Sequence, residues 1–372
     1  MSLNLANACP AILTSLTDNI INNPATVNTH GGTLKALNSE TNLVHGREIR
    51  QANDNGTGQS KEVRVVYKQR LVQADTVTEK NCDIGPELPY IEETFNVTNY
   101  RGISFSMTEA QLRLYCESYA ELVRLTGTND PQQIVMRAGS MGNAQRHFMV
   151  VREMFNDFQL AANALVQAMN TDLLTSISGS FGAWVGNVAS KSYVVQNADG
   201  SINADGLFDF KQDYMITGFN GAPIIIGGSG ALQRVWMNDS RYFGQAANGI
   251  DFSTVRSNTG IADFYFDENV NSVLTGQQKT VVFAPGSLVY TPFLQYERNY
   301  GQIGTMFRFT MPIPGLPEVR CDVRILPNEC DENYAVWMEC YFDVFAAPTT
   351  MFPSDDYLYN VNGIFDASFT QA

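Results

Sequence analysis

The chain has few histidines and no cysteine pattern typical of a metal site. Its 372 residues include three histidines and six cysteines, and no two cysteines form a CxxC pair. Zinc sites are built from Cys and His at short, fixed spacings, so this scatter argues against them. We therefore expect the scattered cysteines to be reduced, as they would be in a cytosol.

A basic surface, a long apolar run and a secretory leader are also missing. Lys and Arg number 24 against 38 Asp and Glu, which gives a net charge of −14 and argues against a general nucleic-acid-binding surface. No stretch approaches the ~18–20 uncharged apolar residues of a membrane span. The first residues lack the basic region of a signal peptide. We therefore expect no membrane association.

Motifs for catalysis are missing as well. The run from Gly227 to Ala231 is close to the G-x-S-x-G turn that presents a nucleophilic serine, between an expected strand and an expected helix. All histidines precede Ser229, whereas hydrolases with this turn place the histidine last. No phosphate-binding glycine loop occurs either. We interpret the run as a glycine turn and expect the protein not to be an enzyme.

A long segment of helical periodicity is present from Asn143 to Ser178. Apolar or small residues recur there at alternating intervals of four and three, at Ala144, Phe148, Val151, Phe155, Phe158, Ala162, Leu165 and Met169. The opposite side carries Arg146, Arg152, Glu153, Asn156, Asp157, Asn163, Gln167 and Asn170. At ~1.5 Å per residue this predicts a helix of roughly 54 Å with one buried and one wet stripe.

The segments before this helix differ in texture. Residues 1–41 lack periodicity and look like an arm that finds its contacts outside its own core. Two strand-like stretches within 42–83, NLVHGREIRQ and KEVRVVYKQRLVQADTV, flank an Asn-Gly turn and predict a long hairpin. From Arg47 to Arg70 the hairpin has net charge +3 in an acidic protein. Such a hairpin is marginal alone and normally lies on something else.

Helices and strands alternate through the rest of the chain. A capping box from Ser106 to Glu109 predicts a helix that stops near Gly127, and Pro131 restarts a helix. Residues 181–295 have short strands with turns at Gly200 and Gly206. Long strands are expected in MFRFTMPI, PEVRCDVRILP and YAVWMECYFDVFAAP, within 296–350. The final residues, 351–372, are aromatic without a clear period.

The order of these parts resembles that of the major capsid protein of tailed bacteriophages, which has the Hong Kong 97-type fold. The likeness covers roughly residues 1–350. The segments that carry it are ISFSMTEAQLRL, VVFAPGSLVYTPF and YAVWMECYFDVFAAP. Their residue patterns are similar to those in capsid proteins of phages that infect Bacteroidetes-type hosts.

The resemblance implies an α+β capsid fold. Its parts would be an N-arm (1–41), an extended loop (42–83), a peripheral domain (84–180 and 296–350) with a spine helix (143–178), an axial domain (181–295) and a C-terminal tail (351–372). The implied function is self-assembly, as hexamers and pentamers, into an icosahedral shell around a double-stranded DNA genome. The implied location is the virion, after assembly in the host cytoplasm.

The resemblance also implies the partners of the chain. These are further copies of itself, portal and scaffold proteins, possible decoration proteins, and packaged DNA bound without sequence preference. No cofactor and no turnover are implied. Some relatives cross-link subunits between Lys and Asn, and Lys61 and Lys68 lie in the hairpin. Nothing identifies an Asn partner, so cross-linking is not predicted.

Charge segregation suggests how copies meet. The hairpin is net +3, whereas Glu318–Asp343 has seven acidic and two basic residues, a net charge of −5. Complementary charges on one subunit type favour contact between neighbouring copies. We therefore expect Arg64, Lys68 and Arg70 to contact the acidic peripheral domain of an adjacent subunit.

Three other functions stay open at this point. The same fold would serve an encapsulin-like compartment shell that holds a cargo enzyme. A tail-sheath or tail-tube subunit is another virion role, although the long helix and single large hairpin favour it less. A soluble enzyme whose active site is assembled only in three dimensions would leave no local motif.

Overall fold

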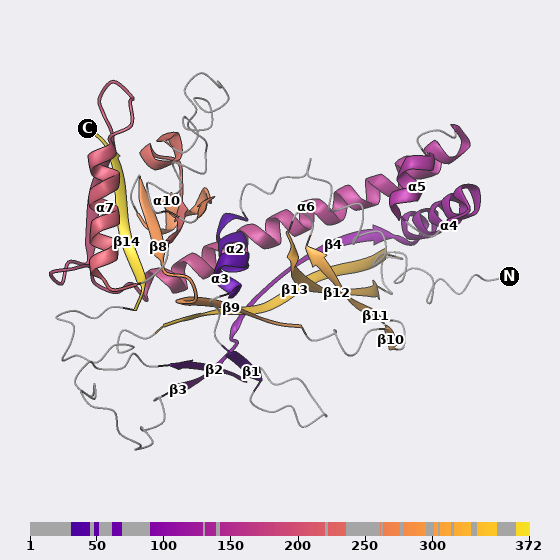
Figure 1. Ribbon diagram of the computed structural model, residues 1–372. Helices are drawn as coiled ribbons and strands as arrows, with labels where there is room; N and C mark the ends of the chain where they lie inside the picture. The colour runs from indigo at the N-terminus through magenta and orange to yellow at the C-terminus, as the bar shows by residue number, and fades with distance from the viewer. Residues whose placement is uncertain are drawn as a thin grey trace, which may run out of the picture. The chain divides into compact units, whose positions relative to one another are not determined.

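A computed structural model describes most of the chain (Figure 1). The described residues are 31–44, 48–51, 62–68, 90–128, 131–138, 142–219, 222–235, 261, 263–275, 278–294, 301–303, 306–313, 316–328, 333–347 and 362–372. They fall into two compact units, each described here by itself. Unit 1 contains 98–169 and 292–342, and unit 2 contains 29–97, 170–291 and 343–372.

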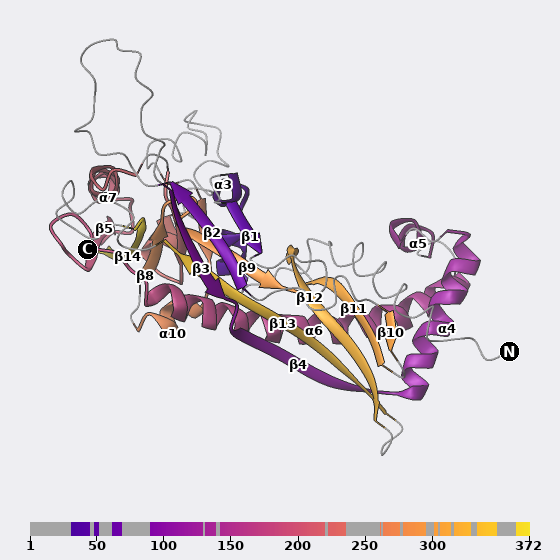
Figure 2. The same cartoon turned by 90° about the horizontal axis from the view of Figure 1, so that it is seen from below.

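Unit 1 is built on an antiparallel sheet, whose strands lie side by side in Figure 2. Its order is β10-β11-β12-β13-β4, and β9 also pairs with β13. The strands are β4 (Asn99–Thr108), β9 (Leu288–Phe293), β10 (Gly301–Ile303), β11 (Met306–Ile313), β12 (Leu316–Asn328) and β13 (Asn333–Ala346). The long strands expected from MFRFTMPI, PEVRCDVRILP and YAVWMECYFDVFAAP are thus present as β11, β12 and β13.

The long helix α6 runs from Gly142 to Ser178, over 37 residues, where a helix was expected from Asn143. Its stripe packs on the sheet of unit 1, since the ring of Phe158 meets Phe105 of β4 edge-on at 5.2 Å. Phe148 is partly exposed, and the side chain of Phe155 lies outside the described residues. The buried members of the stripe are Ala144, Val151, Phe158, Ala162, Leu165 and Met169.

Asn170 was expected on the solvent-exposed face of this helix, and that expectation is wrong. It is 0 % exposed, and the described residues offer its amide no hydrogen-bond partner. The expectation fails because burial widens towards the end of the helix, where Leu173, Leu174 and Ile177 are also fully buried. A stripe assigned over Ala144–Met169 therefore does not describe the final turns of the helix.

The helix α4 (Glu109–Thr126) begins two residues later than the sequence predicts. Strand β4 continues to Thr108, which pairs with Asn333, so Ser106 is in the strand and cannot cap a helix. Thr108 is the cap of α4 (Glu109–Thr126), and Thr108 and Gln111 form a capping box. The predicted stop is confirmed, because Gly127 is left-handed with φ 66°. Helix α5 (Pro131–Ala138) follows.

Unit 2 contains a mixed five-stranded sheet of order β5-β14-β8-β6-β7. Its strands are β5 (Ser190–Gln196), β6 (Ile224–Gly227), β7 (Asp263–Phe266), β8 (Lys279–Phe283) and β14 (Ile364–Gln371). Strand β14 lies between β5 and β8, parallel to the former and antiparallel to the latter. The expected tail is therefore wrong for these last residues, which form an inner strand.

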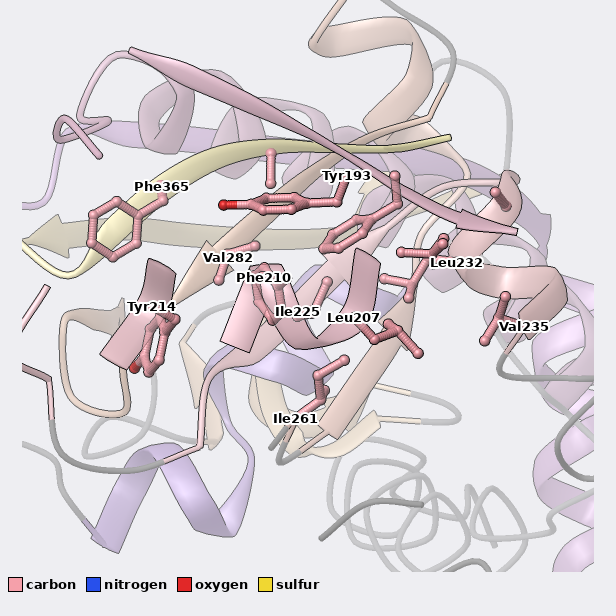
Figure 3. Close-up of a cluster of buried hydrophobic side chains, with 14 of the residues drawn as sticks. Tyr193, Leu207, Phe210, Tyr214, Ile225, Leu232, Val235, Ile261, Val282 and Phe365 are labelled. Atoms are coloured by element: carbon pink, nitrogen blue, oxygen red, sulfur yellow. The ribbon is translucent and has the colours of Figure 1, made fainter. Parts of the chain in front are cut away.

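The physical reason is an aromatic core (Figure 3). Alternate side chains of β14, Phe365, Ala367 and Phe369, enter a buried cluster with Trp184 and Phe210. Phe365 stacks on Trp184 at 4.5 Å between ring centroids, and Phe369 meets Phe210 edge-on at 5.2 Å. Burying two Phe rings outweighs the cost of ordering a chain end.

Residues 31–41 also belong to unit 2 rather than to a free arm. Helix α2 (Gly32–Leu37) buries Leu34, Ala36 and Leu37, and Thr33 is bonded to Asp267 after β7. The arm expected over 1–41 is thus wrong for its last eleven residues, because α2 buries apolar side chains in its own unit. Residues 1–30 lie outside the described part of the chain.

The first expected strand, NLVHGREIRQ from Asn42, begins only at Glu48, and the hydrogen bonds of Asn42 explain the difference. Its amide nitrogen donates to the carbonyl oxygens of Leu37 and Leu288, at 2.8 and 3.0 Å, and its oxygen accepts from the Gly286 N–H at 2.8 Å. These bonds hold residues 40–44 as the short helix α3 (Glu40–Val44). The strand β1 (Glu48–Gln51) starts only after it.

The two expected Asn/Asp-Gly turns have different outcomes. Gly200 adopts φ 86° in a turn, as expected. Asn203 instead caps the helix α7 (Ala204–Ile216) by accepting from the N–H groups of Asp205 and Gly206. Gly206 is required inside the helix because a Cβ there would lie 1.9 Å from the carbonyl oxygen of Val194 in β5.

Candidate assembly interface

The glycine run at Ser229 is a structural turn. Strand β6 ends at Gly227, and a helical segment follows at 231–235, so the predicted order of strand, turn and helix is confirmed. The Asn271 amide donates to Ser229 Oγ at 3.0 Å. An amide cannot take the serine proton, so this pair does not resemble a nucleophile with its base. A Cβ at Gly228 would lie 2.7 Å from the Asn271 side-chain amide, which would have to move to admit it.

Neither a metal-binding cluster nor a membrane-spanning helix is present in the described residues. Within these ranges, no three His, Cys, Asp or Glu side chains gather as a metal site requires. Nor does any helix of the described ranges have the length and apolar character needed to cross a membrane.

The predicted hairpin forms two strands of a three-stranded antiparallel sheet in unit 2. Strand β1 pairs with β2 (Glu62–Lys68), and β2 pairs with β3 (Tyr90–Asn96). Val63 and Val65 are buried on one face of β2. Phe95, opposite Val63, stacks on Phe345 of β13 at 5.4 Å. Residues 343–346 at the end of β13 belong to unit 2, so this apolar face packs within its own unit, with β3 supplying the contact.

The charged face of this sheet is the candidate interface. Arg64 is exposed and alternates with the two buried valines, as the sequence pattern predicts. In register it lies between Arg50 of β1 and Thr94 of β3. Lys68 ends β2 opposite Tyr90, and its side chain is outside the described residues, as is the whole of Arg70. Of the three expected contact residues, Arg64 is the one whose side chain is described.

The acidic counterpart proposed for the hairpin is not a simple surface patch. Asp322 is 2 % exposed and Glu339 is 5 % exposed, and both lie in the sheet of unit 1. They are thus not available to a neighbour's arginines, although the net charge counts them. The expectation overlooked burial, because polar residues at alternate strand positions normally face water.

Asp322 and Glu339 lie opposite each other on β12 and β13. Like charges in this position repel, so each carboxylate needs a donor. Thr310 Oγ1 donates to Asp322 Oδ1 at 2.8 Å, and Tyr100 OH donates to Glu339 Oε2 at 2.7 Å. Arg324 lies 3.3 Å from the same Glu339 oxygen. We call these five residues the carboxylate cluster.

One further contact and a raised pKa characterise this cluster. The Arg324 guanidinium lies 5.1 Å from the ring centre of Trp337, at a distance where cation–π attraction holds it over the ring. Burial and the hydrogen bond to Glu339 raise the pKa of Tyr100 to about 12. The phenol therefore remains a donor at every physiological pH. The cluster is a charge-paired hydrogen-bond network across β4, β11, β12 and β13, in which Asp322 and Glu339 are buried and Tyr100 is 41 % exposed; sequence reasoning missed it.

Comparison with known proteins gives weak structural likeness. No protein-family model and no curated protein matches the chain. The capsid of Ralstonia phage GP4 is similar at 10 % identity and TM-score 0.40, covering 84 % of each chain. The capsid of Staphylococcus phage Andhra has 7 % identity and TM-score 0.39, covering 88 % of this chain and 83 % of that one. A chain from Mycobacterium phage Che8 has 10 % identity and TM-score 0.36, covering 90 % of each.

Proposed function

We propose that the chain is the major capsid protein of a tailed phage, a structural subunit that assembles into a closed shell. The observation that carries the proposal is the packing of α6 on the sheet of unit 1, through Phe158 and Phe105. The sheet combines β4, which precedes the helix, with β10–β13, which follow more than a hundred residues later. This arrangement supports the expected peripheral domain with its spine helix.

The proposed parts follow from the elements. Strands β1 and β2 would be the extended loop, α6 the spine helix and the five-stranded sheet of unit 2 the axial domain. Partners would be further copies in hexamers and pentamers, with portal, scaffold and decoration proteins. An acidic total of −14 suits a container for DNA, because a basic lining would bind DNA tightly through counterion release.

A structural role is further supported by the way in which buried carboxylates are used. Asp267, Asp322 and Glu339 each accept hydrogen bonds from groups of their own unit. Each is thereby committed to joining neighbouring elements.

The proposed hairpin contact is tested by charge reversal. The triple variant Arg64→Glu, Lys68→Glu and Arg70→Glu is expected to assemble poorly while its subunit stays folded, because repulsion would replace attraction at each copy of the interface. Each exposed pair contributes ~0–1 kcal/mol, so the loss arises from summation over many copies. Sedimentation measures the assembled fraction, and circular dichroism measures folding.

The matched control reverses Arg146, Arg152 and Arg234, which are exposed on α6 and after β6. It changes the net charge by the same amount outside the hairpin. Shells from the hairpin variant in normal yield, or equal loss in the control, contradict the proposed contact.

Particles isolated from their native source distinguish a phage capsid from a compartment shell. A capsid should contain nuclease-protected double-stranded DNA of one genome, whereas a compartment should contain an enzyme. Particles filled with a cargo protein and free of DNA contradict the capsid proposal.

A further inference from the structure

The sheet of unit 1 holds two free thiols on neighbouring strands. Cys321 of β12 and Cys340 of β13 are both buried and unoxidised. The pair Asp322 and Glu339 is in register, so Cys321 and Cys340 lie opposite each other one position further along. The Cys340 thiol lies 3.6 Å from the carbonyl oxygen of Arg320, next to Cys321. The two thiol groups are therefore neighbours on one face of the sheet.

Their spacing suits a disulfide bond. Opposed residues in antiparallel strands have Cα atoms about 4.5–5.5 Å apart, and disulfides join Cα atoms about 4.4–6.8 Å apart. No large backbone movement is needed to join them. The surroundings are apolar, with Met311, Val323 and Met338 fully buried around the pair.

We infer that Cys321 and Cys340 form an oxidation site: a cross-strand disulfide that staples β12 to β13 when the protein meets a low-molecular-weight disulfide such as oxidised glutathione. One thiolate attacks the small disulfide, forming a mixed disulfide and releasing one small thiol. The second thiolate then displaces the other small thiol. Two protein thiols are oxidised and one small disulfide is reduced, with two protons lost from the cysteines and taken up by the small thiols.

The same core makes the reaction slow in the folded protein. Hydrogen bonding to Cys321 and burial raise the pKa of the Cys340 thiol well above its usual range, which disfavours the reactive thiolate. Reaction therefore needs a local opening of β12 and β13, and a time on the order of hours. A reducing cytosol leaves the pair free, whereas prolonged exposure to oxidant closes it.

A third cysteine shows that this chain is compatible with oxidation. Cys116 of α4 is disulfide-bonded. The expectation of reduced thiols throughout is therefore wrong for Cys116. The staple would act on a different part of unit 1 and does not depend on the proposed shell function.

Peptide mapping of the full-length wild-type chain tests the inference. The protein is incubated with millimolar oxidised glutathione at pH 8, denatured, alkylated without reduction and digested. The expected product joins the Cys321 and Cys340 peptides with a mass about 2 Da below their sum. The staple should raise the folding equilibrium constant by about a hundred-fold, since it closes a loop of roughly twenty residues.

Cys321→Ala is the matched variant, in which Cys340 should form a reversible glutathione adduct and the stability gain should vanish. If this variant fails to fold, the wild-type peptide map decides alone. Both thiols remaining fully alkylated after this incubation, carried on for the hours that local opening requires, or either thiol linked to a different cysteine, overturns the inference.

Discussion

Replacing Asp267 by Ala should destabilise the protein by about 3–5 kcal/mol, the largest loss expected from a single substitution. The carboxylate is wholly buried and accepts from Thr33 N–H and Oγ1 at 2.9 and 2.7 Å, and from Asn269 N–H at 3.0 Å. Alanine would leave these donors without an acceptor in a site that water does not reach. Each such group costs about 1–3 kcal/mol.

The effect should be strongest at α2. Hydrogen exchange followed by mass spectrometry should show α2 amides exchanging about a hundred-fold faster or more, because Thr33 joins this helix to the turn after β7. The matched control is Asp209→Ala on the exposed side of α7, expected within about 0.5 kcal/mol of wild type. Unchanged exchange at α2 in Asp267→Ala contradicts the assignment of residues 31–41 to the core of unit 2.

Replacing Glu339 by Ala should lower the free energy of unfolding by about 2–4 kcal/mol, the second largest effect that we predict. It removes the acceptor of Tyr100 and the counterion of Arg324, whose side chain is 30 % exposed. That exposure, and relief of the repulsion from Asp322, keep the loss below the upper range for a buried pair. Glu339→Gln should cost less, because the amide oxygen still accepts from Tyr100 and the repulsion is gone. Denaturant unfolding measures these differences.

A double-mutant cycle with Tyr100→Phe isolates the hydrogen bond to Glu339. We expect a coupling energy of about 1 kcal/mol between the two positions. The control Glu153→Ala, exposed on α6, should change stability by less than about 0.5 kcal/mol. A cycle that closes with no coupling, or a Glu339→Ala variant as stable as the control, argues against a stabilising role for the carboxylate cluster.

Elements with strong local periodicity were predictable from the sequence. The helix α6 repeats its apolar residues through about seven turns, from Ala144 to Met169, and three of the long strands of unit 1 are bounded by Pro, Asn or Asp. Local signals also place the end of α4 at Gly127. In each case the information lies within a few residues of the element itself.

Elements that depend on distant partners were not predictable in this way. Strand β14 is fixed by β5 and β8, which lie far away in sequence, and Asn42 becomes helical through bonds to Gly286 and Leu288. The carboxylate cluster needs β4, β12 and β13 to be adjacent before Glu339 is buried. The contact role of Arg64 stays a prediction, supported by its exposure.

Negative-stain electron microscopy of the purified full-length protein tests the central claim most directly. The account predicts closed polyhedral shells of uniform diameter, because a capsid subunit joins copies of itself through repeated contacts that close on themselves. Tubes indicate a tail protein instead. Small discrete oligomers with no shells, under conditions where the subunit is folded, contradict the proposal that this chain builds a capsid.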